Sequence, residues 1–158
     1  MISRRAFLRS GALVPLPLVA FEEARAADYA SAREALDAID RLEADVETRL
    51  RSIAAALPGA RPFVASVLAD QRRHRAERAR VRRRLGLAVP SPPPPPSVER
   101  DLASLRAAQE ALVYAHAEGL PALGDVWAVD VLARHLVSTA RQLTVIDLWI
   151  EAEEARGG

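Results

Sequence analysis

The residues of this chain that could bind a metal ion are its histidines and the carboxylates near them. His74 and Glu77 lie three positions apart, so a helix would place both side chains on one face. A second segment carries Glu110 and, six positions later, His116. Imidazole and carboxylate together can hold a single transition-metal ion. These four residues are the candidate ligands, and none of them is assigned as a ligand from the sequence alone.

The third histidine, His135, follows Asp130 by five positions, so the two side chains point to different faces of a helix. With Arg134 beside it, we expect His135 at the surface or rim of the fold. Ser138 and Thr139 follow His135 on its own face, but helical residues so placed rarely form a nucleophile–base pair, and no oxyanion donor is evident. The sequence therefore predicts no catalytic residues, and we do not expect an enzyme.

Composition excludes several further classes of site. The chain has 158 residues, which suits one domain, and it contains no cysteine. A disulfide scaffold, a thiolate zinc site, an iron–sulfur cluster and a thiol nucleophile are thereby excluded. The formal net charge of +1 gives no global field for binding nucleic acid. Any metal site must therefore use histidine and carboxylate.

Basic residues are concentrated in residues 72–84, which hold eight arginines and one acid, Glu77. Such density suggests phosphate binding, but no aromatic residues are interleaved to stack on bases, so no nucleic-acid partner is expected. We expect a solvated, ion-paired face. Contact with anionic lipid headgroups, cell-wall polymer or an acidic partner is the alternative. The acids available for pairing lie in the preceding predicted helix: Asp37, Asp40, Glu43, Asp45 and Glu47.

Apolar residues recur every three or four positions in four segments, which predicts four amphipathic helices. The helices are expected over residues 29–57, 62–85, 97–120 and 125–154. Their candidate N-caps include Asp28, Ser97 and Asp125, and Gly86 is a candidate stop. The apolar seam of the last helix is expected to comprise Val126, Val129, Leu132, Leu136, Leu143, Ile146 and Ile150.

The middle of the core is expected to be polar. In the second and third helices, the seam that carries the apolar residues carries polar residues at its centre. Hydrogen-bonded layers of this kind fix the register of a bundle at some cost in stability. The residues assigned to this polar core layer are Gln71, His74, Arg78, Gln109 and His116.

Four such helices predict an all-α protein folded as one four-helix bundle. A Pro-rich linker, at about residues 88–97, joins the second helix to the third. A polyproline stretch rises ~3.1 Å per residue, so the linker could reach about 30 Å, the length of a helix of about 20 residues. The third helix could therefore run parallel to the second. If the linker is a slack loop, the two helices could instead be antiparallel.

Two helical hairpins joined by a long connection resemble ferritin-like four-helix domains. Residues 70–78, the Pro-rich stretch after them and the segment Tyr114-Ala-His116 resemble an uncharacterised ferritin-like family of exported bacterial proteins. The resemblance covers about residues 29–154. It implies a di-iron centre with Glu-x-x-His on two of the helices. This sequence has only the reversed order, at His74 and Glu77, so we expect a degraded metal site and assign no cofactor, with a transition metal left open.

The N-terminus resembles a bacterial twin-arginine export signal. The consecutive Arg4 and Arg5 are followed by one residue and then by Phe7 and Leu8, as in that motif. The apolar stretch after them has about 11 residues and two prolines, whereas a membrane-spanning helix needs about 20 apolar residues. We therefore expect export of the folded chain through the twin-arginine translocase and no transmembrane segment in the mature chain.

A small-x-small site for signal peptidase follows at Ala24 and Ala26. Cleavage after Ala26 would separate a signal peptide, residues 1–26, from a mature bundle, residues 27–158, in the periplasm or another extracytoplasmic compartment. Removal of the signal takes away four arginines and two glutamates, so the formal net charge falls from +1 to −1.

The function expected from these features is binding or assembly in the cell envelope, with another envelope protein or a second copy of the chain as partner. Two alternatives stay open. One is a metal-binding ferritin-like redox or storage protein. The other is a small-ligand carrier that uses the core between His74 and His116.

Overall fold

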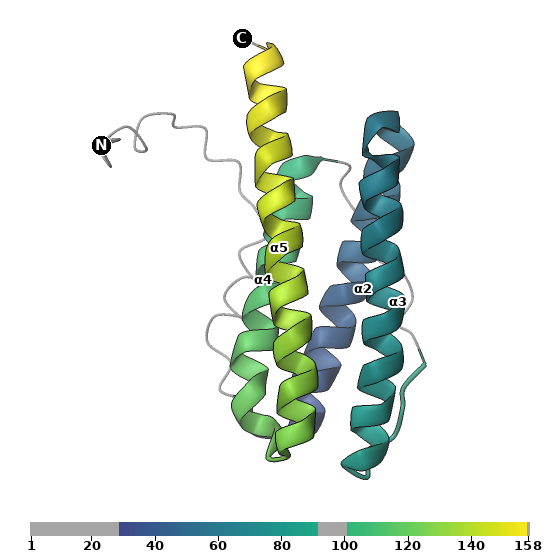
Figure 1. The fold of residues 1–158 in the computed structure, drawn as a ribbon, viewed down its shortest axis with the longest axis vertical. Helices are drawn as coiled ribbons and strands as arrows, with labels where there is room; N and C mark the ends of the chain where they lie inside the picture. Colours follow the sequence, from purple (N-terminus) through teal and green to yellow (C-terminus); the bar gives the residue numbers. More distant parts are fainter. Residues whose placement is uncertain (1–28, 92–100, 158) are drawn as a thin grey trace, which may run out of the picture.

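The computed structural model describes residues 29–91 and 101–157, and within these residues the chain is helical with no strand. Figure 1 shows four long helices packed side by side, which confirms the predicted all-α four-helix arrangement. The long helices are α2 (Ala32–Ala56), α3 (Arg61–Arg84), α4 (Leu102–Gly119) and α5 (Val126–Gly157). Short 3₁₀ turns, η1 (Pro58–Ala60) and η2 (Leu120–Leu123), connect the helices of each hairpin. The predicted signal peptide, Asp28 and Ser97 lie outside the described residues.

Two helices begin later than predicted, because other side chains cap them. Ser31 accepts the backbone N–H of Glu34 at 3.3 Å, so α2 begins at Ala32 and not at Tyr29. Asp101 accepts the N–H of Ser104 at 2.7 Å, which makes it the N-cap of α4 in place of Ser97.

The predicted boundaries at the other end of the bundle are confirmed. Asp125 caps α5 by accepting the N–H of Ala128 at 2.9 Å. Gly86 follows the end of α3 at φ +70°, a left-handed conformation that favours glycine and ends helices.

The directions of the helices settle how the two hairpins are joined. Leu102 at the start of α4 lines the same hollow as Ala60, just before α3, and Trp149 near the end of α5. At the opposite end, Gly119 of α4 lies against Ala35 of α2. Helices α3 and α4 therefore run in the same direction, diagonally across the bundle, as Figure 1 shows. The end of α3 and the start of α4 lie at opposite ends of the bundle, so the connection between the hairpins is a crossover.

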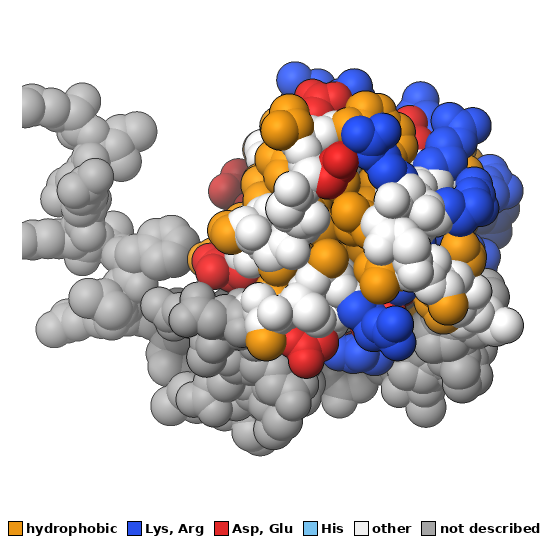
Figure 2. Space-filling view, turned by 90° about the horizontal axis from the view of Figure 1, so that it is seen from below, with side chains coloured by type: hydrophobic (Ala, Val, Ile, Leu, Met, Phe, Trp, Pro, Cys, Tyr) orange, Lys and Arg blue, Asp and Glu red, His pale blue; other side chains and the backbone are white. Residues whose placement is uncertain are grey.

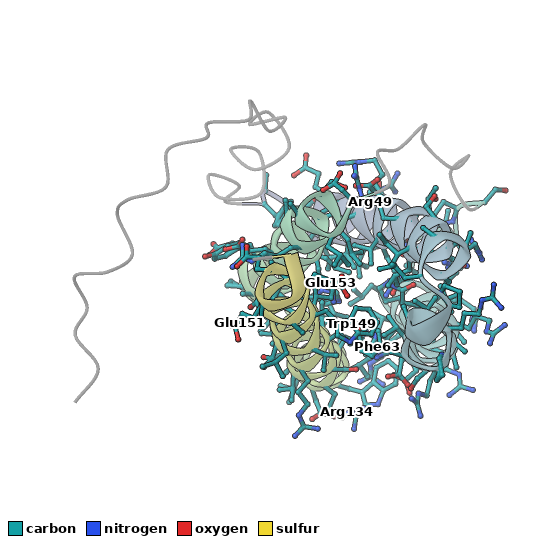
Figure 3. The ribbon with its side chains drawn as sticks, turned by 90° about the horizontal axis from the view of Figure 1, so that it is seen from above. Arg49, Phe63, Arg134, Trp149, Glu151 and Glu153 are labelled. Carbon is teal, nitrogen blue, oxygen red and sulfur yellow. The ribbon has the colours of Figure 1, made fainter. Side chains whose placement is uncertain are left out.

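The core is apolar at both ends and polar in the middle. At the upper end in Figure 1, the rings of Phe63 and Trp149 meet edge to face with their centroids 4.6 Å apart, and Figure 3 shows them between α3 and α5. At the lower end, Leu36 and Leu123 are buried. Between these layers the helices present a series of buried polar side chains: Glu43, Gln71, His74, Arg78, Gln109, His116, His135, Thr139 and Gln142.

The predicted seam of α5 is wrong only in part, since Val129 and Ile150 lie half-buried against the core as the spacing predicted. Val126 is 88% exposed, although the apolar spacing placed it in the core. Leu132 and Ile146 are buried as expected. The buried positions other than Val131 follow alternating steps of four and three residues: Ala128, Leu132, His135, Thr139, Gln142 and Ile146. Polar residues hold the middle of this seam, so hydrophobicity alone pointed to a neighbouring stripe.

Candidate functional site

The three histidines of the chain meet in the middle of the bundle, each on a different helix. His74 of α3 stacks on His135 of α5 with ring centroids 4.1 Å apart. His116 of α4 meets His135 edge to face at 6.1 Å. We call these three residues the histidine cluster. The prediction that His135 lies at the surface is wrong: the residue is 1% exposed, because its place on the α5 seam turns it towards α3 and α4.

Hydrogen bonds determine which ring nitrogen of two histidines carries the proton. His116 Nδ1 lies 2.8 Å from the carbonyl oxygen of Leu112, which can only accept, so Nδ1 is the donor. His135 Nε2 lies 2.7 Å from Oε2 of Glu77, so Nε2 donates to that carboxylate. The remaining nitrogens, His116 Nε2 and His135 Nδ1, are buried and have no hydrogen-bond partner among the described residues. Each is an imidazole lone pair inside the core.

Burial keeps the histidine cluster uncharged. Desolvation, reinforced by the charge of Arg78, lowers the pKa of His74 to about 4. Burial is also the main cause that lowers the pKa of His116 to about 3 and that of His135 to about 2. A buried guanidinium beside three neutral imidazoles makes the middle of the core unfavourable for additional positive charge.

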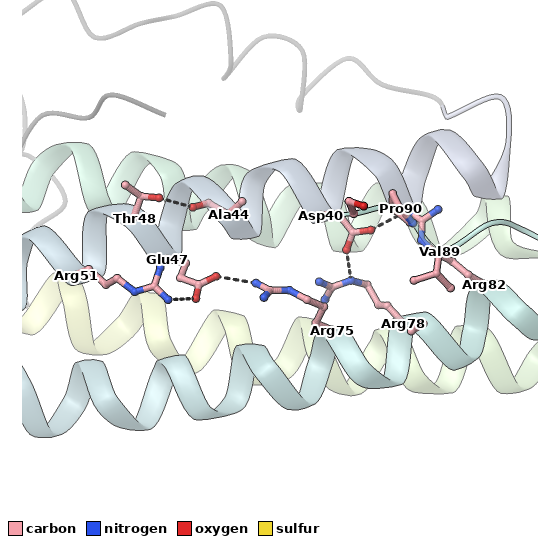
Figure 4. Close-up of a pocket in the computed structure, with 12 residues that line it drawn as sticks. Asp40, Ala44, Glu47, Thr48, Arg51, Arg75, Arg78, Arg82, Val89 and Pro90 are labelled. Atoms are coloured by element: carbon pink, nitrogen blue, oxygen red, sulfur yellow. Dashed lines mark hydrogen bonds and ion pairs between the residues drawn. The ribbon is translucent and has the colours of Figure 1, made fainter. Parts of the chain in front are cut away.

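Arg78 is the centre of a row of ion pairs between α2 and α3, shown in Figure 4. Its guanidinium donates from Nε to Asp40 at 2.8 Å, as Figure 4 shows. Both terminal nitrogens donate to Glu43. Arg78 and Glu43 are each 1% exposed. Burial raises the pKa of Glu43, an effect that Arg78 opposes. The pKa of Arg78 is itself raised, since Glu43 and Asp40 outweigh the desolvation of the guanidinium.

The row continues on both sides of Arg78. Arg82 donates to Asp37 and to Asp40, at 2.7 Å each, and Arg75 donates to Glu47 at 2.6 Å. The arginines lie three and four positions apart on α3, and their partners repeat at similar steps on α2, so antiparallel packing brings the two series together. We call this set the ion-pair ladder: Arg75, Arg78 and Arg82 with Asp37, Asp40, Glu43 and Glu47.

The predicted pairing of acidic and basic helices is confirmed, but the ladder is not a solvated face. Arg78 and Arg82 are buried, and only their neighbours towards the outside of α3 are exposed. The signal in the sequence was the shared spacing of residues 75, 78 and 82 with residues 40, 43 and 47. A search for apolar residues at helical spacing does not detect this pattern, because all of these residues are charged.

A groove of about 470 Å³ runs along the outer side of the ladder between α2 and α3. Ladder side chains line one wall, and Val89 and Pro90 lie at one end (Figure 4). Neither His74 nor His116 lines this groove, so it is separate from the core region that the small-ligand alternative invoked.

A second polar group lies in the core, nearer the upper end of the bundle. Gln109 donates to the carbonyl oxygen of Thr139 at 3.0 Å and to the side chain of Gln142 at 3.1 Å. The amide of Gln71, also buried, has no partner for its oxygen or its nitrogen among the described residues. All five residues predicted for the polar core layer are therefore buried, and Glu43, His135, Thr139 and Gln142 join them.

The candidate metal ligands do not assemble into a metal site. Glu110 pairs with Arg106 of its own helix at 2.8 Å, and Glu77 bonds to His135. Within residues 29–91 and 101–157, no three histidine, aspartate or glutamate side chains are grouped so that they could hold a metal ion. The most buried carboxylate, Glu43, is engaged by Arg78. These residues do not fit the di-metal centre that a ferritin-like domain implies.

No helix among the described residues combines the length and the apolar character that crossing a bilayer requires. Comparison of the chain with protein-family models, with curated proteins and with solved structures finds no match.

Proposed function

We propose that this chain is an exported, ferritin-like four-helix bundle that acts by binding or assembly, without a metal centre. The observation that carries the proposal is the position of Arg78. Its guanidinium lies in the middle of the bundle and pairs with Glu43 and Asp40, so neither carboxylate is free to bind a metal ion. A buried, permanently charged arginine is a poor neighbour for a divalent cation.

The topology supports the ferritin-like part of the proposal. Ferritin-like bundles have one long crossover connection between two antiparallel hairpins. The parallel directions of α3 and α4 agree with that arrangement. The expected export through the twin-arginine translocase places the protein in the periplasm or another extracytoplasmic compartment, where its partner is an envelope protein or a second copy of the chain.

Metal analysis of the protein purified from its native compartment tests the proposal. We expect iron, manganese, copper and zinc each well below one atom per chain. One metal atom or more per chain would overturn the proposal. Light scattering during size exclusion, together with cross-linking in the envelope, tests the binding part: a strict monomer that captures no partner would contradict it.

A second candidate function, transition-metal binding, is favoured by the two unpartnered imidazole nitrogens. His116 and His135 each donate from one nitrogen to a carbonyl or carboxylate and keep the other nitrogen free, as metal-ligating histidines commonly do. Titration with Cu²⁺ or Zn²⁺ separates the candidates. Tight 1:1 binding that is lost in His116→Gln and in His135→Gln would favour the metal, and its absence would favour the proposal above.

A further inference from the structure

The outer surface of α3 and the adjoining edge of α5 are strongly basic. The carboxylates of this surface are fewer than its arginines: Asp130 is exposed, and Asp70, Glu77 and Asp125 are half-buried. We call this surface the α3–α5 face. Its arginines are Arg72, Arg73, Arg80, Arg83 and Arg84 on α3, and Arg134 and Arg141 on α5.

Four of these guanidinium groups have no carboxylate partner among the described residues: Arg72, Arg80, Arg83 and Arg141. The ion-pair ladder does not need them, since its carboxylates are already bonded to Arg75, Arg78 and Arg82. The α3–α5 face thus carries positive charge that the fold itself does not neutralise.

One end of this face also exposes apolar side chains. Val126 is 88% exposed and Trp127 is 38% exposed at the start of α5. The guanidinium of Arg84 lies over the Trp127 ring, 5.5 Å from its centroid. Figure 2 views this end of the bundle from below and shows hydrophobic side chains beside arginines. A tryptophan next to arginines is typical of surfaces that rest at a membrane interface.

We propose that the α3–α5 face docks on an anionic lipid bilayer. Guanidinium groups bind phosphate oxygens in pairs, and the exposed end of α5 supplies a tryptophan and a valine for the headgroup layer. The inference rests on the proposed envelope function and names its binding surface. Base stacking on a nucleic acid would require aromatic residues among the arginines, and among the described residues of this face only Trp127 is aromatic.

Vesicle flotation with the purified exported protein tests the proposal. The vesicles are phosphatidylcholine alone or phosphatidylcholine mixed with phosphatidylglycerol. We expect binding only to the anionic vesicles at low salt and release at high salt, because salt screens charges at exposed surfaces. Replacing two unpaired arginines, Arg80→Gln with Arg83→Gln, should lower the partition coefficient about tenfold or more.

A matched double variant, Arg33→Gln with Arg41→Gln, removes the same charge from exposed positions of α2. Figure 3 shows Arg49 of the same helix on the opposite side of the bundle from Arg134, so this variant should bind anionic vesicles as the wild type does. Trp127→Ala should weaken the binding while circular dichroism stays unchanged.

Absence of binding to anionic vesicles at low salt would overturn the inference, and so would an equal loss of binding in both double variants. If the chain captures an acidic envelope protein but does not bind anionic vesicles, the lipid-docking inference is overturned and the proposed binding function stands. A metal atom bound to each chain would instead overturn the proposed function, whatever the vesicles show.

Discussion

Helix α2 is held by two neighbours in opposite ways. Against α4 it packs through small and apolar side chains, so closely that a Cβ added at Gly119 would lie 3.2 Å from the Cβ of Ala35. Against α3 it is joined by the ion-pair ladder, whose central pair is buried. The α2–α4 contact leaves no space for a larger side chain at Gly119, and the α2–α3 contact needs both charges of its central pair. Neighbouring helices of one bundle are thus held together by close apolar packing in one case and by ion pairs in the other.

The two contacts should respond differently to substitution. Apolar packing loses free energy in proportion to the volume that is removed or forced in. A buried ion pair contributes little relative to apolar residues of the same size, but removal of one partner leaves an uncompensated charge in the core. The following predictions test this contrast.

The largest effect is expected from Arg78→Ala, which leaves Glu43 buried without its partner. The free energy of unfolding should fall by about 3–5 kcal/mol, as is typical when one member of a buried pair is removed. Replacing both members, Arg78→Met with Glu43→Met, should recover most of that loss. Urea denaturation measures both effects, and a double variant no more stable than Arg78→Ala would contradict the account of the ladder.

Overpacking the α2–α4 contact should cost somewhat less. Gly119→Leu places a side chain where Ala35 leaves no room, and we expect a loss of up to about 3 kcal/mol in the free energy of unfolding. Gly59→Ala is the control, because a Cβ there meets no atom within 4 Å. Equal losses in the two variants would show that backbone freedom, and not crowding, determines the cost.

Mild acid should lower the free energy of unfolding, because the histidine cluster is buried in its neutral form. The folded-state pKa values of its members lie well below the ordinary value of 6.5, so the unfolded chain binds protons that the folded chain does not. Stability is therefore full well above pH 6.5 and falls as the pH drops through 6.5 towards 4. Between pH 7 and pH 6 the three residues together should cost about 2 kcal/mol, measured by urea denaturation at each pH. A stability that stays flat over this range would mean that the rings are not desolvated.

The smallest effect is expected at an exposed pair. Arg134 and Asp130 lie one turn apart on α5 with their atoms 3.1 Å apart and with both side chains 60% exposed. Arg134→Ala should change the free energy of unfolding by at most about 0.5 kcal/mol, because solvent screens such pairs. Comparison with Arg78→Ala isolates burial as the cause, since both variants remove an arginine that contacts a carboxylate. If Arg134→Ala lowered the free energy of unfolding by several kcal/mol, burial would not explain the difference between the two pairs.

The sequence predicted much of the fold, because local patterns encode it. Apolar spacing located four helices, and Asp125 and Gly86 marked boundaries through local capping chemistry. The polar positions on α3 and α4 were recognisable because apolar residues flank them on the same seam. His135 was missed because Thr139 and Gln142 continue its seam as polar residues, while Val126 suggested another stripe.

The site depended on contacts that no single helix encodes. Glu43 resembles the other acids of α2 until α3 is placed beside it, and the burial of Arg78 follows only from packing of all four helices. The direction of α4 relative to α3 could not be decided from linker length, because the same residues can be taut or slack.

The crossover between the hairpins has a consequence for the rate of folding. Ala35 and Gly119, which lie against each other between α2 and α4, are far apart in the sequence, whereas the contacts within each hairpin are local. The hairpins can form quickly, and their mutual docking must close a long loop, so docking should limit the rate. Each doubling of that loop costs only about 0.6 kcal/mol of closure entropy. Lengthening the connection should therefore slow refolding modestly and leave the rate of unfolding unchanged.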